Sequence, residues 1–242
     1  MFSHEKLTVY QKALTCVATL NKHARSWDKR HVVVDHLLRA SESILLNLVE
    51  GVRLRRAAHR QHYAEYAIGS ALECAACLDI GVLKGFLALP AAQSDKSSLC
   101  EVVKMLTGLR RSWGSDELRE EESSYRAGEK LFAHERLEVY QLGLQFVGWV
   151  HAQPAGAALS SRLFRQLDKL ATSAVLNMAE GNGRYSVADR HKFIDLAASA
   201  AAKSAAYVDL CWRSGELNPD QRTQGSELLG SILRILDALG GS

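Results

Sequence analysis

Proline, cysteine and long apolar runs are all scarce in this chain of 242 residues. The three prolines, Pro90, Pro154 and Pro219, each fall where the helical pattern is expected to break. The five cysteines are an odd number and too few for a disulfide scaffold, which fits a reducing compartment. No apolar run approaches the roughly 18 residues that a membrane span requires, and residues 1–26 lack the apolar centre of a signal peptide. We therefore expect a cytoplasmic protein without contact to a membrane.

Sequence motifs of catalysis and of metal binding are also missing. The chain contains no phosphate-binding loop, no nucleophile elbow, no dinucleotide fingerprint and no Glu-x-x-His pair of a di-iron bundle. His59 and His62 are three residues apart on one helix face and could hold a metal ion, but without a Glu-x-x-His motif the paired-carboxylate di-iron bundle has no ligand set. Cys74 and Cys77 form C-x-x-C without a second Cys or His pair, which predicts buried free thiols on a helix. The sequence thus predicts a non-enzymatic protein without metal or cofactor.

The chain repeats itself at a constant offset of 130 residues. Nine of the sixteen residues from Phe2 to Val17 are identical at the offset, far above chance. These are Phe2, His4, Glu5, Leu7, Val9, Tyr10, Gln11, Leu14 and Val17. A second match pairs Ser43, Leu46, Asn47, Glu50 and Gly51 with Ser173, Leu176, Asn177, Glu180 and Gly181. We interpret the chain as a fused tandem of one domain, with repeats at 1–112 and 132–242. Residues 113–131 are either a linker or an extension of the preceding helix.

Apolar residues fall at helical spacing nearly everywhere, and the alternation typical of strands is absent. Asn218 before Pro219 is a helix start, and Ser186 with Asp189 resembles a capping box. The expected helices are 5–26, 30–51, 57–85, 94–111, 133–152, 158–181, 186–214 and 219–239. The predicted fold is all-α, with two tandem four-helix bundles related by the internal repeat.

Positive charge is concentrated in the first repeat. Residues 1–110 hold 15 Lys and Arg against 10 Asp and Glu, residues 111–131 hold 4 against 6, and residues 132–242 hold 11 against 11. The stretch from Gly51 to Ala64 contains six basic or titratable residues and no acidic one. They are Arg53, Arg55, Arg56, His59, Arg60 and His62. Arginine side chains beside His and Tyr suit contacts to phosphates and bases, so this stretch is the candidate nucleic-acid site. The alternative is a solvated helix end.

Polar residues recur at or beside a core face in both repeats. Asn47 and Glu50 lie on the side of their helix that carries Ile44 and Leu48, and Asn177 with Glu180 repeats the pair. Buried Asn and Glu require hydrogen-bond partners, for which Tyr10, Ser43 and Ser70 are candidates in the first repeat. We interpret the four residues as structural polar networks that fix the register of the helices, with ligand or interface roles as the alternative.

These motifs resemble a known family. The opening L-x-V-Y-Q, the pattern S-I-x-x-N-x-x-E-G and the turn from Glu180 to Ser186 are similar to bacterial four-helix-bundle proteins encoded in ribosomal-RNA intervening sequences. The same superfamily includes the Avd accessory proteins of diversity-generating retroelements. The first repeat departs from the family pattern at residues 52–55, and a tandem copy is unusual for it.

The resemblance implies a non-enzymatic protein that assembles into rings. In the retroelement case it also implies binding to a reverse transcriptase and to nucleic acid. The leading hypothesis is therefore an accessory protein that binds RNA or DNA and a reverse transcriptase, and that forms a homo-oligomer. The rival hypothesis is a structural scaffold or protein-interaction module in which the duplicated faces bind each other or another protein. The basic stretch discriminates between them, because only the first hypothesis requires it.

Overall fold

The computed structural model describes residues 2–114, 131–153 and 159–240. All its regular elements are helical, which confirms the predicted all-α class. The N-terminal helix set comprises the 3-10 turn η1 (Ser3–Lys6), α1 (Thr8–Ser26), α2 (Val32–Arg53), α3 (Ala57–Leu83) and α4 (Leu89–Trp113). The C-terminal helix set comprises η2 (Ala133–Arg136), α5 (Glu138–Ala152), α7 (Arg162–Asn182), α8 (Val187–Arg213) and α9 (Pro219–Gly240).

Most helix boundaries agree with the sequence prediction to within a few residues, but α4 begins five residues before the expected start at residue 94. Pro90 was expected to separate helices, whereas it lies in the first turn of α4. A proline is tolerated there because the first turn has no partner for its missing N–H group. Pro219 opens α9 in the same way. α7 begins later than predicted, at Arg162, where the hydroxyl of Ser161 accepts a hydrogen bond from the backbone N–H of Phe164.

Each helix set is a closed group of four helices in which every helix contacts its two neighbours. Element starts recur at the offset of 130 residues, as η1 and η2 at residues 3 and 133 show. Fully buried Leu20, Leu37, Ile44, Leu48, Leu78, Leu99 and Leu106 fill the N-terminal set. Fully buried Val147, Phe164, Leu167 and Val208 fill the C-terminal set. The common arrangement agrees with the tandem interpretation, which rests on the sequence identities. The predicted alternatives for residues 113–131 fall mostly on residues outside the described part.

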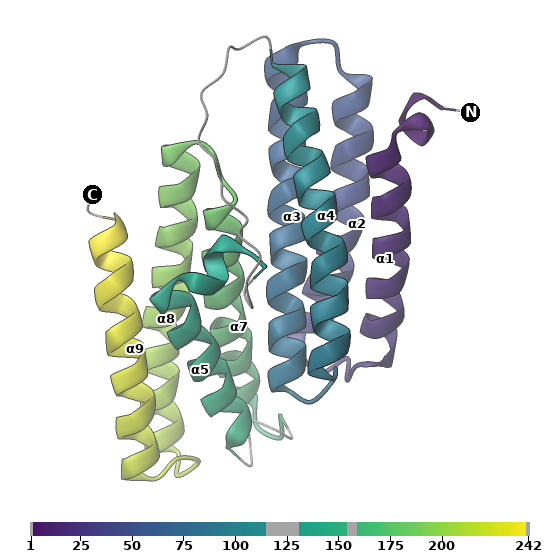
Figure 1. The fold of residues 1–242 in the computed structure, drawn as a ribbon. Helices are drawn as coiled ribbons and strands as arrows, with labels where there is room; N and C mark the ends of the chain where they lie inside the picture. Colours follow the sequence, from purple (N-terminus) through teal and green to yellow (C-terminus); the bar gives the residue numbers. More distant parts are fainter. Residues whose placement is uncertain (1, 115–130, 154–158, 241–242) are drawn as a thin grey trace.

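Helix α3 is the central element, because it contacts α2 and α4 of its own set and α5 and α7 of the other. Figure 1 shows α5 and α7 beside α3, with α1 and α9 at opposite sides of the molecule. α3 is long and apolar enough to cross a membrane, whereas the sequence analysis expected a helix of about this length but no apolar run that could span a membrane. However, 72% of its most apolar window is buried inside the structure, as in the core helix of a soluble protein.

The thiols of Cys74 and Cys77 are buried within α3 and form no disulfide, as predicted. Burial raises the pKa of both thiols well above the ordinary value. They therefore stay protonated at neutral pH and behave as small apolar groups.

Candidate nucleic-acid interface

The basic stretch of the sequence forms the turn between α2 and α3. α2 ends at Arg53 and α3 begins at Ala57, so Arg55 and Arg56 lie in the connection between them. Both arginines are exposed, as are His59 and His62 in the first turns of α3. The N-terminus of α3 adds its partial positive charge at this place.

Two of the predicted arginines are engaged within the chain, and His62 lies 3.7 Å from Glu65. The exposed guanidinium of Arg53 pairs with Glu50, at 3.0 Å between Nη2 and Oε1. Arg60 donates through Nε to the carbonyl oxygen of Gly51 at 3.3 Å, and its guanidinium lies 4.4 Å from the ring centroid of Trp113. Arg60 therefore joins the end of α2 to the end of α4. This leaves Arg55 and Arg56 as the predicted arginines that project most freely.

The corresponding turn of the C-terminal set lies against α3, where Arg184 contacts Tyr66 and Gly69, and against the last turn of α4. The guanidinium of Arg110, at the end of α4, stacks 3.7 Å from the ring centroid of Tyr185, and its Nε bonds Glu65 at 2.7 Å. This contact joins the turn before α8 to the last turns of α4. In Figure 1 the start of α8 and the ends of α2 and α4 point toward the same end of the molecule. We call the exposed basic side chains at the α2–α3 turn, in the first turns of α3 and α8 and in the last turn of α4 the basic end. Its members are Arg55, Arg56, His59, His62, Arg111, Arg190 and Lys192.

Sequence analysis assigned the basic surface mainly to the first repeat and did not foresee that α4 and α8 extend it. Arg111 is 47 residues beyond the end of the basic stretch, and Arg190 belongs to the other repeat. The start of α8 is held near the end of α4 by the contact between Arg110 and Tyr185, and no sequence motif predicts this contact.

The repeated asparagines bond to their own helices. Asn47 donates through Nδ2 to the carbonyl oxygen of Ser43 at 2.9 Å and to its hydroxyl at 2.8 Å. The Ser43 hydroxyl lies 2.8 Å from that of Ser70, which connects α2 to α3. Asn177 donates to the carbonyl oxygen of Ser173 at 2.7 Å. Both asparagines are partly buried, and no bond to Tyr10 is found within the part of the chain that the structure describes.

The repeated glutamates have different surroundings. Glu50 is partly exposed and pairs with the exposed Arg53. Glu180 pairs with the buried Arg184, whose guanidinium approaches Gly69 of α3 so closely that a Cβ there would lie 3.3 Å from Nη2. Burial, assisted by the nearby Glu73, raises the pKa of Glu180. The glutamate of the repeated motif thus lies at the surface in the N-terminal set, whereas in the C-terminal set it lies at the contact between the two sets.

A buried ion pair joins the two helix sets. The ammonium of Lys84, at the end of α3, donates to the carboxylate of Asp168 on α7. Nδ1 of His31 lies 3.1 Å from the same ammonium and 3.5 Å from Asp168. All three side chains are almost completely buried. Burial lowers the pKa of Lys84, and contacts with His31 and Lys84 outweigh burial to lower that of Asp168.

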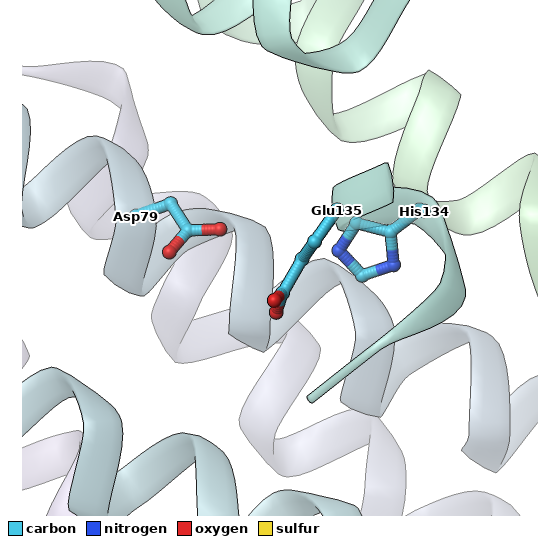
Figure 2. Close-up of side chains that lie close together, drawn as sticks. All are labelled: Asp79, His134 and Glu135. Atoms are coloured by element: carbon cyan, nitrogen blue, oxygen red, sulfur yellow. The ribbon is translucent and has the colours of Figure 1, made fainter. Parts of the chain in front are cut away.

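A second buried group surrounds Lys96 of α4. Its ammonium lies 2.7 Å from Asp79 of α3 and 2.8 Å from Glu135 of η2. The hydroxyl of Tyr140 donates to the other oxygen of Asp79 at 2.8 Å, and the backbone N–H of Leu131 donates to Glu135 at 3.0 Å. Figure 2 shows the two carboxylates approaching each other from α3 and η2.

The second group also has the composition of a possible metal site, because ligand atoms of Asp79, His134 and Glu135 all lie within 4.8 Å of one another. However, the four carboxylate oxygens already have partners in Lys96, Tyr140 and the Leu131 N–H. The lysine supplies the positive charge that a metal ion would otherwise provide. The arrangement therefore fits a docking contact between the sets better than a metal centre.

Comparison with known families gives one match. Residues 5–108 match the family model of the 23S rRNA-intervening sequence protein. The N-terminal helix set resembles an intervening-sequence protein. No curated protein and no solved structure matches the chain.

The matched segment covers α1, α2, α3 and most of α4. It includes Arg53, Arg55, Arg56 and the rest of the basic stretch, whereas Arg111, Arg190 and Lys192 of the basic end lie outside it. The match agrees with the family resemblance of the first repeat and connects this part of the chain with a helical family linked to RNA. The turn at 180–186, which carried the more specific motif, lies outside it.

His134 provides a pH-dependent test of how tightly η2 is buried. Its ring is fully buried, and burial together with Lys96 lowers its pKa from 6.5 to about 3. At pH values between the two pKa values, His134 binds a proton in the unfolded chain but not in the folded chain. The free energy of unfolding therefore falls as the pH falls through this range. From pH 7 to pH 5 we expect the wild type to lose about 2 kcal/mol more unfolding free energy than His134→Phe.

The measurement is urea denaturation followed by circular dichroism at both pH values. His4→Phe is the matched control, because His4 is the equivalent residue of η1 and is partly exposed. The same pH dependence in His134→Phe and wild type would show that His134 is not held neutral by the contact between the sets.

Proposed function

We propose that this chain is a non-enzymatic accessory protein that binds nucleic acid through the basic end. The observation that carries the proposal is that Arg55, Arg56 and Arg111 are exposed at the α2–α3 turn and at the end of α4, while exposed Arg190 and Lys192 lie near the start of α8, and the turn before α8 contacts Arg110 of α4. Guanidinium groups bind phosphates through forked hydrogen bonds, and the N-termini of α3 and α8 add positive potential at the same end.

The family match supports an RNA-linked role, because it covers the helices that present most of these side chains. His59 and His62 lie beside the arginines, and Tyr63 and Tyr66 follow on α3 with ring centroids 5.8 Å apart. Aromatic rings beside arginines favour single-stranded nucleic acid, whose bases are free to stack.

The finer proposal is that the protein partner is the reverse transcriptase of a diversity-generating retroelement. Its support is the resemblance of both repeats to the accessory proteins of these elements. Co-expression of the chain with a reverse transcriptase of this class, followed by co-purification at two salt concentrations, tests it. If the two proteins separate at both concentrations, the nucleic-acid proposal stands without this partner.

A structural scaffold is the second candidate, favoured by the extensive contact between the helix sets. The buried ion pairs at Lys84 and Lys96 support this candidate, because through them one helix set packs on the other with complementary charges. A scaffold does not need the basic end, which separates the two candidates.

Charge reversal of the basic end tests the first candidate. In the triple variant Arg55→Glu, Arg56→Glu and Arg111→Glu we expect the log–log salt slope of single-stranded RNA binding to weaken by about 2, since each lost phosphate contact on a single strand removes about 0.7. At low salt the affinity should fall by roughly 100-fold or more. Fluorescence anisotropy with single-stranded RNA, single-stranded DNA and duplex over a salt series provides the measurement.

The matched control reverses three exposed basic residues elsewhere, Lys29, Arg136 and Arg234, and so makes the same change in net charge. An Arg190→Glu and Lys192→Glu variant measures the share of the C-terminal set, which we expect to be smaller. If the control weakens binding as much as the triple variant, binding is unspecific attraction to net charge and the scaffold candidate is favoured.

A further inference from the structure

Two exposed tyrosines lie where the turn before α8 meets α3 and α4. Tyr66 of α3 is 44% exposed, and Tyr185 of the turn is 45% exposed. The guanidinium of Arg184, the residue before Tyr185, lies 5.2 Å from the ring centroid of Tyr66. The guanidinium of Arg110 lies 3.7 Å from the ring centroid of Tyr185, and its Nε donates to Glu65, the residue before Tyr66, at 2.7 Å. Two contacts between the helix sets therefore hold both rings at one place. We call Tyr66, Tyr185, Arg110 and Arg184 the tyrosine seam.

Each ring of the tyrosine seam contacts an arginine that is itself held in place. Arg184 is 8% exposed, pairs with Glu180 and also lies 4.7 Å from the ring centroid of Phe193. Arg110 pairs with the buried Glu65. A guanidinium on the face of an aromatic ring attracts it, so both tyrosines are oriented before any ligand binds. Nearly half of each tyrosine remains open to solvent and is available for a further stacking partner.

The internal repeat shows that the fold itself does not require the two rings. At the offset of 130 residues Tyr66 corresponds to Leu196, which is also 44% exposed, and Tyr185 corresponds to the exposed Arg55. The helices form with an aliphatic side chain at the first position and a charged one at the second. Core packing therefore does not account for the exposed tyrosines.

The tyrosine seam is continuous with the basic end. His62, a member of the basic end, lies one helical turn before Tyr66, and their rings are stacked with centroids 6.5 Å apart. Exposed Arg190 of α8 donates through Nη2 to the backbone carbonyl oxygen of Arg184 at 3.3 Å. On α4, exposed Arg111 is the residue that follows the other arginine of the seam. Side chains that suit phosphate contacts thus border the two rings.

Exposed aromatic rings beside cations suit unpaired nucleobases. A base stacked on an aromatic side chain contributes to binding whatever its identity, while neighbouring cations bind the phosphates. The nearby carboxylate of Glu65 accepts from Arg110 and lies 3.7 Å from His62, so it is not free to bond the edge of a base. The bases of a duplex are stacked on one another and cannot bind in this way. These features fit a single strand bound with little sequence preference.

We propose that the tyrosine seam binds unpaired bases of a single-stranded nucleic acid whose phosphates lie on the basic end. This inference rests on the proposed function and adds to it the residues that select a single strand over a duplex. Tyr66 belongs to the N-terminal helix set and Tyr185 to the C-terminal set, so the bound strand contacts both sets. The site exists only while the two sets are docked.

The double variant Tyr66→Leu and Tyr185→Leu tests the proposal in the full-length chain, because it removes both rings and no arginine. Both tyrosines are exposed, so circular dichroism should show unchanged folding. At fixed salt we expect the affinity for single-stranded RNA or DNA to fall by roughly 100-fold, since each lost stacking contact weakens binding by about tenfold. The log–log salt slope and the affinity for duplex should stay the same, because no phosphate contact is removed. Fluorescence anisotropy over a salt series provides the measurement.

Two control variants accompany this test. Tyr66→Phe with Tyr185→Phe keeps both rings and should bind single strands like the wild type. Trp212→Leu removes a ring that also contacts arginines but lies at the other end of α8, with Arg213 and Arg222 at 4.3 and 4.7 Å from its centroid. It should likewise bind like the wild type.

Photocrosslinking of the wild type gives a readout that depends on no variant. The probes are single-stranded RNA and single-stranded DNA that carry 5-iodouracil, irradiated in complex with the protein. Mass spectrometry should then identify Tyr66 or Tyr185 as the crosslinked residue, and the two probes distinguish RNA from DNA as the strand that the seam accepts.

Four results would overturn the proposal. They are unchanged single-strand affinity in the leucine double variant, an equal loss for duplex, an equal loss in Trp212→Leu, and crosslinks confined to residues outside the seam. If charge reversal of the basic end still weakens binding in those cases, the proposed function stands without the tyrosine seam. A wild type that binds no nucleic acid would overturn both.

Discussion

Asp168→Ala is expected to lower the free energy of unfolding by about 3–5 kcal/mol, because it leaves the ammonium of Lys84 buried without its carboxylate. The lysine lies at the end of α3, enclosed by the other set, and its remaining partner is His31 at 3.1 Å. A buried ammonium without a counter-charge either loses its proton or opens the contact to water, and both cost stability. Urea denaturation of the full chain, followed by circular dichroism at pH 7, measures the loss.

The internal repeat supplies the control for this variant. At the equivalent positions the chain has Leu38 and Ser214, so the double variant Asp168→Leu and Lys84→Ser introduces a pair that the same fold already contains. Replacing both partners of a buried ion pair by neutral residues is often close to neutral. We expect the double variant to recover most of the stability. A double variant as unstable as Asp168→Ala would mean that the loss reflects packing rather than an unpaired charge.

Lys96→Met is expected to cost a similar amount, about 3–5 kcal/mol, because it leaves Asp79 and Glu135 buried without their common cation. The methionine keeps the apolar stem of the lysine, so the loss reports the charge. Tyr140→Phe should cost only about 1 kcal/mol, since it removes one hydrogen bond to Asp79.

Two variants calibrate this result. Lys169→Met removes an exposed lysine from α7, and Tyr10→Phe removes the hydroxyl at the equivalent, partly exposed position of α1. Both should stay within about 0.5 kcal/mol of the wild type. If Lys96→Met fell within the same range, the buried group would not contribute to the docking of the two sets.

The helices were predictable because each has an apolar stripe and because every stripe occurs twice in the sequence. Pro90 was misread since its position one residue into α4 is as compatible with a helix start as with a break. The internal repeat could have corrected the predicted start of α4. Pro219, which was predicted to open a helix, corresponds to residue 89 at the offset of 130, one position before Pro90.

The contact between the helix sets was not predictable from local sequence. Tyr10 and Tyr140 occur in identical motifs, yet only Tyr140 is fully buried. What differs is the partner surface, which is formed by α3 and by Lys96 of α4 and is distant in the sequence. For the same reason the charge of Arg60 was visible in the sequence, but its stacking on Trp113 was not.

The buried pair of Lys84 and Asp168 also gives the molecule a means of distinguishing its own junction from every other. If the C-terminal set of one chain packed on α8 of a second chain as it packs on its own α3, Asp168 would be buried opposite Ser214 and would lack a cation. If α1 and α2 of a second chain packed on α3 in place of α5 and α7, Leu38 would lie against the ammonium of Lys84. Each mismatched junction buries one unpaired charge, whereas the internal junction buries none. The ion pair of Lys84 and Asp168 thus specifies that the C-terminal helix set packs on α3 of the N-terminal set.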